Sequence, residues 1–123
     1  MNELRFQDGT DEIIGAAFEV ANTLGAGFLE KVYEGALLAE LRLRGVKAAQ
    51  QVLYPVTYKG QQIGKYFADL VVEDRVIVEL KCAESLAPEH MGQCINQLKV
   101  SGLKVALLIN FRRTKIEWKR IVL

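Results

Sequence analysis

The sequence predicts a single compact α/β sandwich with elements in the order ααββββαββ. Its 123 residues suffice for one domain with a substantial core and are too few for two ordinary domains. Hydrophobic residues make up 50% of the chain and charged residues 25%, which is typical of a globular protein. Segments with helical periodicity are followed by β-branched apolar runs, and no repeat, linker or low-complexity stretch divides the chain.

Two helices are expected before the first strand. In residues 8–24, apolar side chains recur at helical spacing, and acidic residues lie near the start, where the helix dipole favours them. Residues 25–27, Gly-Ala-Gly, end this helix. A second helix is expected over residues 28–44, because apolar residues again recur along it and Gly45 is a suitable C-terminal stop.

Two strands are expected to follow the helices. Residues 46–58 have the composition of a strand, with Pro55 near an edge or a bulge because proline donates no ladder hydrogen bond. Residues 59–62, Lys-Gly-Gln-Gln, predict a turn into a second strand through residues 63–66.

The next two strands are the most strand-like part of the chain. Residues 67–72 and 76–80 are both apolar and β-branched, and residues 73–75, Glu-Asp-Arg, lie between them as a turn. This pattern predicts a hairpin in which Val72 faces Val76.

The charged side chains of this hairpin predict a metal site. Counting outward from the turn brings Asp69 directly opposite Glu79, and Lys81 shares their face because side chains alternate along a strand. Facing Cβ atoms lie about 4.5–5.5 Å apart, and like charges there are destabilising unless something neutralises them. A divalent cation would do so. The alternative is that the acidic residues mark a solvated strand face, and these residues alone leave both interpretations open.

A third helix and two strands complete the expected fold. Pro88 suits the first turn of a helix that runs to about Ser101, and Gly102 suits the position just past its end. Residues 105–111 then predict a buried strand, and residues 115–122 a short last strand.

Charged residues are distributed unevenly, although the formal net charge is only +1. Residues 1–40 contain eight acidic and two basic residues, while residues 99–123 contain seven basic residues against Glu117 alone. These basic residues are Lys99, Lys104, Arg112, Arg113, Lys115, Lys119 and Arg120. They suit contact with a phosphate backbone, or else they keep alternate strand positions soluble, and both interpretations stay open.

Composition also bears on the compartment. No stretch approaches the 18 or more apolar residues of a membrane span, and the first residues do not lead into a secretory signal, so a cytoplasmic protein without a membrane partner is expected. Cys82 and Cys94 are the two cysteines, and free thiols are expected in a reducing compartment. With His90 as the lone histidine, the chain offers a poor ligand set for structural zinc.

Several motifs resemble those of a known family. Residues 27–33, Gly-Phe-Leu-Glu-Lys-Val-Tyr, have the pattern that names the GxxExxY proteins of the PD-(D/E)XK nuclease superfamily. The resemblance runs from about Asp11 to Leu123 and includes three further motifs in the right order: Tyr58-Lys59-Gly60, Asp69 with Glu79-Leu80-Lys81, and residues 107–111.

This resemblance implies a restriction-endonuclease-like core, a mixed sheet flanked by helices that holds a metal where two strands diverge. By position, it implies that Asp69, Glu79 and the Leu80 carbonyl are metal ligands and that Lys81 orients or activates water. It also implies that Glu30 is an additional acidic ligand from an early helix. His90 and Gln93 would be polar site residues of the third helix.

Some of these residues also have plain structural explanations. Glu30 lies near a helix start, where the dipole stabilises a carboxylate without catalysis, and His90, apart from the resemblance, fits an ordinary helix surface better than a catalytic site. The chain also departs from its relatives, whose helix often carries a tyrosine four residues after the glutamine, whereas Gln97 occupies that position here. The departure puts in question any contact that the aromatic ring would make.

The resulting expectation is a Mg²⁺- or Mn²⁺-dependent nuclease that hydrolyses phosphodiester bonds in DNA, with RNA as the second choice. The alternative is a non-catalytic module with a nuclease fold that binds nucleic acid or a partner as one component of a repair or defence assembly. The small size and low net charge favour that alternative, since affinity for a duplex would be weak without help. A homodimer or a protein partner would supply the missing surface.

Overall fold

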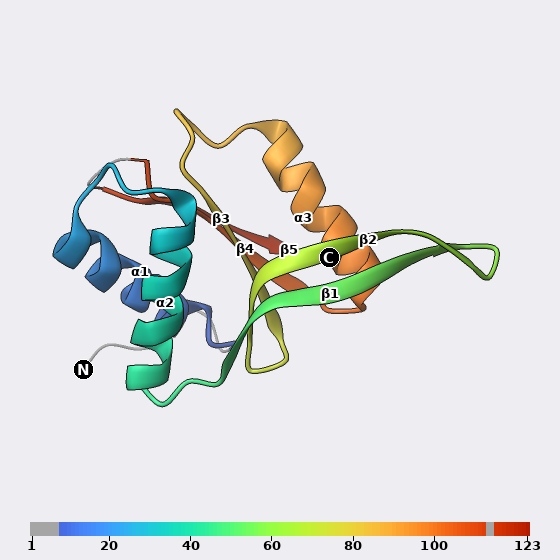
Figure 1. The fold of residues 1–123 in the computed structure, drawn as a ribbon, viewed down its shortest axis with the longest axis horizontal. Coiled ribbons are helices and arrows are strands. Elements are labelled where there is room, and N and C mark those ends of the chain that lie inside the picture. The colour runs from blue at the N-terminus through green and yellow to red at the C-terminus, as the bar shows by residue number, and fades with distance from the viewer. Residues whose placement is uncertain (1–7, 113–114) are drawn as a thin grey trace.

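The computed structural model describes residues 8–112 and 115–123. Within these residues the elements are α1 (Thr10–Leu24), α2 (Glu30–Leu43), β1 (Ala48–Tyr58), β2 (Gln61–Val72), β3 (Val76–Lys81), α3 (Pro88–Ser101), β4 (Val105–Asn110) and β5 (Glu117–Val122) (Figure 1). The strands form one sheet in the order β1-β2-β3-β4-β5. Only β3 and β4 run parallel, so the sheet is mixed and the expected fold class is confirmed.

The order of elements differs from the expectation in one place. Two strands were expected over residues 63–66 and 67–72, but β2 runs unbroken, so the observed order is ααβββαββ in place of ααββββαββ. Both segments pair with the same antiparallel partner, β1, and the register continues from Tyr54–Tyr66 to Leu53–Phe67 without interruption. With one continuous partner, no physical reason remains for a break.

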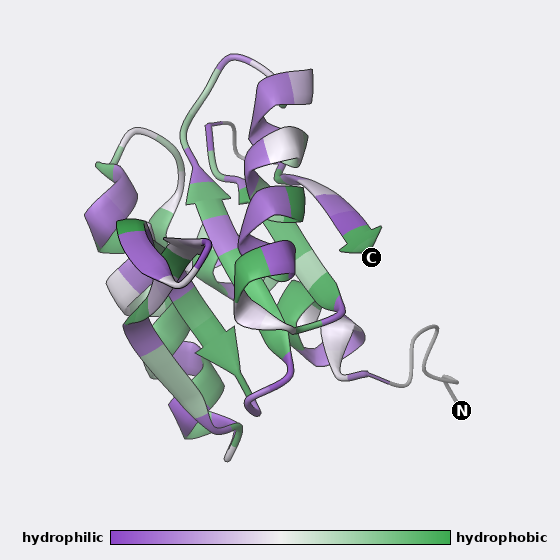
Figure 2. Ribbon diagram, turned by 90° about the vertical axis from the view of Figure 1, so that its right-hand side faces the viewer, coloured by the Kyte–Doolittle hydropathy of each residue, from purple (hydrophilic) through white to green (hydrophobic). Residues whose placement is uncertain are grey.

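Two layers of helices cover the sheet (Figure 1). Helices α1 and α2 pack on one face against alternate residues of the central strands, among them Val76, Val78, Leu107 and Ile109. Helix α3 packs on the other face, against the residues between them, Ile77, Ala106 and Leu108. Every residue of β4 is consequently buried, and the central strands are predominantly hydrophobic (Figure 2).

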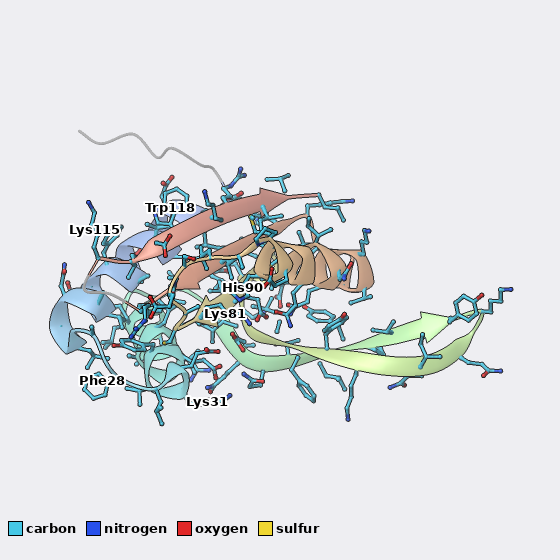
Figure 3. All side chains as sticks on the ribbon, turned by 90° about the horizontal axis from the view of Figure 1, so that it is seen from above. Phe28, Lys31, Lys81, His90, Lys115 and Trp118 are labelled. Atoms are coloured by element: carbon cyan, nitrogen blue, oxygen red, sulfur yellow. The ribbon has the colours of Figure 1, made fainter. Side chains whose placement is uncertain are left out.

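The first two strands extend beyond the sheet as a two-stranded arm. Strands β1 and β2 have 11 and 12 residues, whereas β3 has 6 and pairs with β2 only from Leu70 to Val72. The rest of the pair, residues 52–67, is called the β1–β2 arm below, and it projects away from the body of the molecule (Figure 3). Pro55 lies in β1 at the edge of the sheet, as expected.

Both strands change the face that they present where the arm begins, at Gln51 and Asp69. On the sheet side, even-numbered residues join the α1–α2 layer: Ala48, Leu70 and Val72. On the arm side, even-numbered residues join the α3 layer: Val52, Tyr54 and Ala68. Since alternate side chains of a regular strand keep one face, the pleat inverts here, and Gln51 has the left-handed φ of 51°.

Both cysteines are free thiols, as expected, with Cys94 buried. No helix in residues 8–112 and 115–123 is long and apolar enough to cross a membrane.

An ion pair joins the start of α1 to β5. Asp8 accepts hydrogen bonds from the Thr10 amide and hydroxyl, and its carboxylate lies 2.6 Å from Nη2 of Arg120. Burial by itself raises the pKa of Asp8, but the hydrogen bonds from Thr10 and Arg120 outweigh it and leave the pKa below its ordinary value.

We therefore expect Asp8→Asn to lower the free energy of unfolding by about 1–2 kcal/mol at neutral pH. Because the folded pKa is lowered, this stabilisation is present above the unfolded carboxyl's value of 3.8 and is lost as the pH falls through the folded value. Urea unfolding from pH 7 to pH 3 measures it, with Glu19→Gln on α1 as the control. A loss of the same size at both ends of the range would contradict this account.

Candidate active site

The site is built where β2 and β3 part. The ladder between them covers Val72–Val76, Val71–Ile77 and Leu70–Val78, so the next position brings Asp69 opposite Glu79, as the sequence predicts. In place of ladder hydrogen bonds, the Asp69 amide donates to Oε1 of Glu79 at 3.2 Å, and the Leu80 amide donates to Oδ2 of Asp69 at 2.9 Å. Each carboxylate is thus fixed by the backbone of the opposite strand.

The two carboxylates are poorly solvated. Glu79 is 5% exposed, and burial, followed by the nearby Asp69 charge, raises its pKa to about 8. Burial is also the largest cause of the raised pKa of Asp69. Two facing acids in such a place need neutralisation, either by protons or by a cation.

Lys81 and Gln93 meet beside the carboxylates. Nζ of Lys81 donates to Oε1 of Gln93 at 3.2 Å, which ties the end of β3 to helix α3. The backbone of Lys81 is held from the other side, because β3 pairs in parallel with β4 from Val76 to Lys81. Gln93 therefore positions the ammonium group.

Glu30 begins helix α2 and reaches the same place. Burial is the largest cause of its raised pKa, while Lys81 lowers that pKa and Asp69 raises it again, so both charges lie within electrostatic range. Its carboxylate also accepts a hydrogen bond from the Cys82 amide. The structure thus places Glu30 within electrostatic range of Asp69 and Lys81, beside the pair of Asp69 and Glu79.

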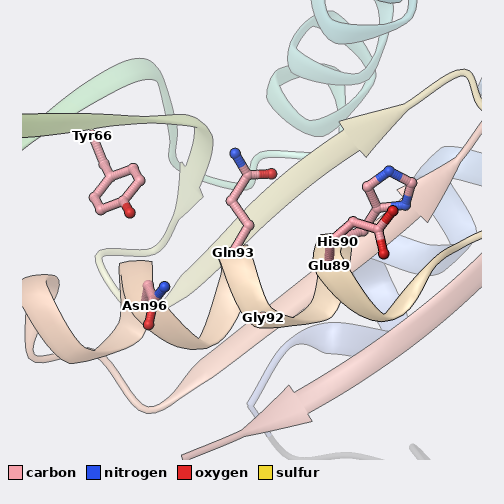
Figure 4. Close-up of a pocket in the computed structure, with 6 residues that line it drawn as sticks. All are labelled: Tyr66, Glu89, His90, Gly92, Gln93 and Asn96. Carbon is pink, nitrogen blue, oxygen red and sulfur yellow. The ribbon is translucent and has the colours of Figure 1, made fainter.

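His90 lies in the first turn of α3, and its Nδ1 accepts a hydrogen bond from the Ala87 amide at 3.0 Å. The ring therefore satisfies a backbone donor at the start of the helix, a structural role that the sequence allows but does not specify. It sits one helical turn from Gln93 (Figure 4).

Tyr33 fixes the approach to α2. Its hydroxyl donates to the Gly25 carbonyl at 2.6 Å and accepts from the Phe28 amide at 3.3 Å, while its ring stacks on Phe111 with centroids 4.8 Å apart. The residue packs and bonds to backbone, so the loop before Glu30 is held in place from the core.

Three polar residues that belong to the site, Glu34, Gln50 and Gln51, were not predicted from the sequence. Glu34, 3% exposed, lies one turn after Glu30 and accepts hydrogen bonds from the amides of Gln50 and Gln51. Nε2 of Gln51 lies 2.9 Å from Glu34 and 3.3 Å from Oδ1 of Asp69, so this amide bridges the two carboxylates. The spacing of four between Glu30 and Glu34 was the one available signal, since it places both on one face of a helix.

Gln97, the residue at which the sequence departs from the resemblance, is 2% exposed and hydrogen-bonds to Glu79. Its Oε1 is buried and has no hydrogen-bond partner among the described residues. Gln97 therefore supplies an amide donor to the site.

Asn110 holds the segment that follows Lys81. Its Oδ1 accepts from the amides of Ala83 and Arg112 at 3.0 and 3.2 Å, and its Nδ2 donates to the Ala83 carbonyl and to Glu117 at 3.0 and 3.1 Å. Asn110 is 2% exposed, so these bonds are shielded from water.

Two of the basic residues near the C-terminus form ion pairs with acidic side chains. Arg112 pairs with Glu84 at 2.6 Å, and Arg120 pairs with Asp8. Arg113 lies outside the described residues.

The donor set suits a hard divalent cation. The Leu80 amide N–H donates a hydrogen bond to Asp69. In an extended strand the N–H and C=O of one residue point to the same edge, so the Leu80 carbonyl is directed toward the carboxylates. Over residues 8–112 and 115–123, no three His, Cys, Asp or Glu side chains are grouped closely enough to hold a metal by themselves. Two carboxylates, a carbonyl and several waters match the preference of Mg²⁺.

Comparison with known proteins agrees with this geometry. The model of the PD-(D/E)XK nuclease superfamily matches residues 7–121. The fold is similar to that of an alkaline exonuclease from Laribacter hongkongensis, LHK-Exo, with a TM-score of 0.51 and 16% sequence identity over 91% of this chain and 81% of that chain. No curated protein matches the sequence. The match over nearly the whole chain shows that it belongs to the PD-(D/E)XK nuclease superfamily.

Proposed function

We propose that this protein is a divalent-metal-dependent nuclease that hydrolyses phosphodiester bonds in DNA. The observation that carries the proposal is the meeting of two carboxylates, the half-buried Asp69 and the buried Glu79, with the ammonium of Lys81 at the point where β2 and β3 part. The GxxExxY pattern is intact and supplies Glu30 at the start of α2.

Each residue has a role in this proposal. Asp69, Glu79 and the Leu80 carbonyl hold Mg²⁺ or Mn²⁺, with Glu30 in support. When bound, such an ion polarises the phosphoryl group and lowers the pKa of a coordinated water. Lys81 places positive charge where the phosphate gains negative charge during attack, and Gln93 keeps the lysine in that orientation.

The alternative is a module that binds nucleic acid without cleaving it. The complete set of Asp69, Glu79 and Lys81 favours catalysis, because a buried and a half-buried carboxylate beside an ammonium serve no evident purpose in a surface that merely binds. A second copy of the chain or another protein would extend the small surface available to DNA, as would be needed for tight binding.

The direct test uses purified protein with single-stranded, duplex and branched DNA and with RNA, each in Mg²⁺, Mn²⁺ or chelator. We expect cleavage of DNA that requires the metal and stops in chelator. Binding without cleavage under every condition would favour the non-catalytic alternative, and cleavage of RNA alone would reassign the substrate.

A further inference from the structure

A cleft lies between the β1–β2 arm and helix α3 (Figure 4). Its volume is about 490 Å³, within the range of small-molecule binding sites. The residues that line it are Tyr66 from the arm and Glu89, His90, Gly92, Gln93 and Asn96 from α3.

The lining favours an uncharged planar ligand. None of the lining residues is Lys or Arg, and Glu89 adds a negative charge, so the cleft is a poor place for a phosphate. The phenol ring of Tyr66 offers a stacking surface, and the amides of Gln93 and Asn96 offer both donors and acceptors. A nucleobase has the matching features, an aromatic face and an edge of donors and acceptors.

The cleft adjoins the candidate active site through one shared side chain. Gln93 lines the cleft and also accepts the hydrogen bond from Lys81 at 3.2 Å. A nucleotide whose phosphate lies beside Lys81 therefore has its neighbouring base close to Gln93 and Tyr66.

We propose that this cleft is a nucleobase-binding subsite, and that the substrate is consequently a single-stranded segment of DNA. A base inside a duplex is paired and stacked, so it enters such a cleft only from a single strand or after leaving the helix. The inference rests on the proposed function for the placement of the phosphate, but binding of the base itself needs no cleavage.

Gly92 allows the cleft to be filled without harm to the fold. A Cβ added there meets nothing within 4 Å among the described residues, and glycine is unfavourable inside a helix, so Gly92→Phe grows into the cleft while the helix gains stability. Gly35 on α2 provides the matched control, because it is also a helical glycine with open space at its Cβ and does not line the cleft.

The experiment measures binding in chelator, where metal-dependent cleavage is stopped, with single-stranded oligodeoxynucleotides that carry 2-aminopurine, a base whose fluorescence is quenched on stacking. We expect Gly92→Phe and Tyr66→Ala to weaken binding roughly fivefold to a hundredfold and to abolish the quenching. Tyr66→Phe keeps the aromatic ring, so it should retain both the affinity and the fluorescence quenching. Gly35→Phe should bind like the wild type. Equal binding by Gly92→Phe and Gly35→Phe would overturn the proposal, as would tighter binding of duplex than of single strand.

An abasic oligonucleotide gives a second, independent readout. Removal of the base that occupies the cleft should weaken the wild type but not Tyr66→Ala, because that variant has already lost the contact. Preference for the matched RNA would overturn the assignment to DNA. Base binding without cleavage in any metal would refute the proposed nuclease activity but support the nucleobase subsite. Cleavage that is insensitive to Gly92→Phe would support the nuclease activity but refute the subsite.

Discussion

Lys81→Ala is expected to lower the rate of metal-dependent cleavage by roughly 10²- to 10³-fold, as removal of one fixed positive group from a developing anion typically does. The side chain is half-buried and oriented by Gln93, so its removal takes a fixed positive charge from the site. Single-turnover rates at saturating metal measure the effect. Lys81→Met, which keeps the length of the side chain without its charge, should lose as much activity as the alanine variant.

The control is Lys99→Ala, which removes an exposed lysine from the same helix that carries Gln93. Both proteins should unfold at temperatures close to that of the wild type. A Lys81→Ala protein that cleaves at the wild-type rate would refute the assignment of this lysine to the chemistry.

Glu79→Ala completes this test by separating binding from cleavage. It should abolish both cleavage and the heat of Mn²⁺ binding in calorimetry, while affinity for single-stranded DNA in chelator stays within about threefold, because other residues make those contacts. Retained cleavage would contradict the metal site.

The second large effect is expected at Asn110. Asn110→Ala removes a buried side chain that makes four hydrogen bonds and leaves the Ala83 amide and carbonyl without their partner. At about 1 kcal/mol for each bond, the loss is about 3–4 kcal/mol, which lowers the melting temperature by roughly 10–15 °C. Differential scanning calorimetry measures this change.

Asn110→Asp is the matched variant for this prediction. It has nearly the same shape and keeps the two acceptor contacts, but it loses both donors and places a carboxylate against Glu117 and the Ala83 carbonyl. It should be no more stable than the alanine variant at neutral pH. Wild-type stability of either variant would show that the Ala83 segment is held by other means.

Local patterns predicted the centre of the site. A tight turn at residues 73–75 fixes the register of β2 and β3, and counting along two strands then places Asp69 opposite Glu79 without knowledge of the rest of the fold. The prediction of helix α3 also depended on local signals, because Pro88 and Gly102 mark its two ends. Such features depend on residues close together in the sequence.

What the sequence did not reveal depends on distant contacts. The carboxylate of Glu34 looks like any surface acid until Gln50 and Gln51 approach it from another element. The division of β2 into two strands was wrong for a related reason, since its continuity comes from pairing with β1. The inverted pleat at Gln51 was also beyond prediction, because glutamine has no sequence preference for a left-handed φ.

That inversion assigns the two ends of β1 and β2 to different layers of the core. Because the strands change face at Gln51 and Asp69, Val52 and Tyr54 at the base of the arm pack with the α3 layer, whereas Leu70 and Val72 pack with the α1–α2 layer. Residues inserted in cross-strand pairs near Lys59 and Gly60 would extend the reach of the arm and leave Asp69 where it is. The tip of the arm can therefore change in length without a change in the packing around the carboxylates.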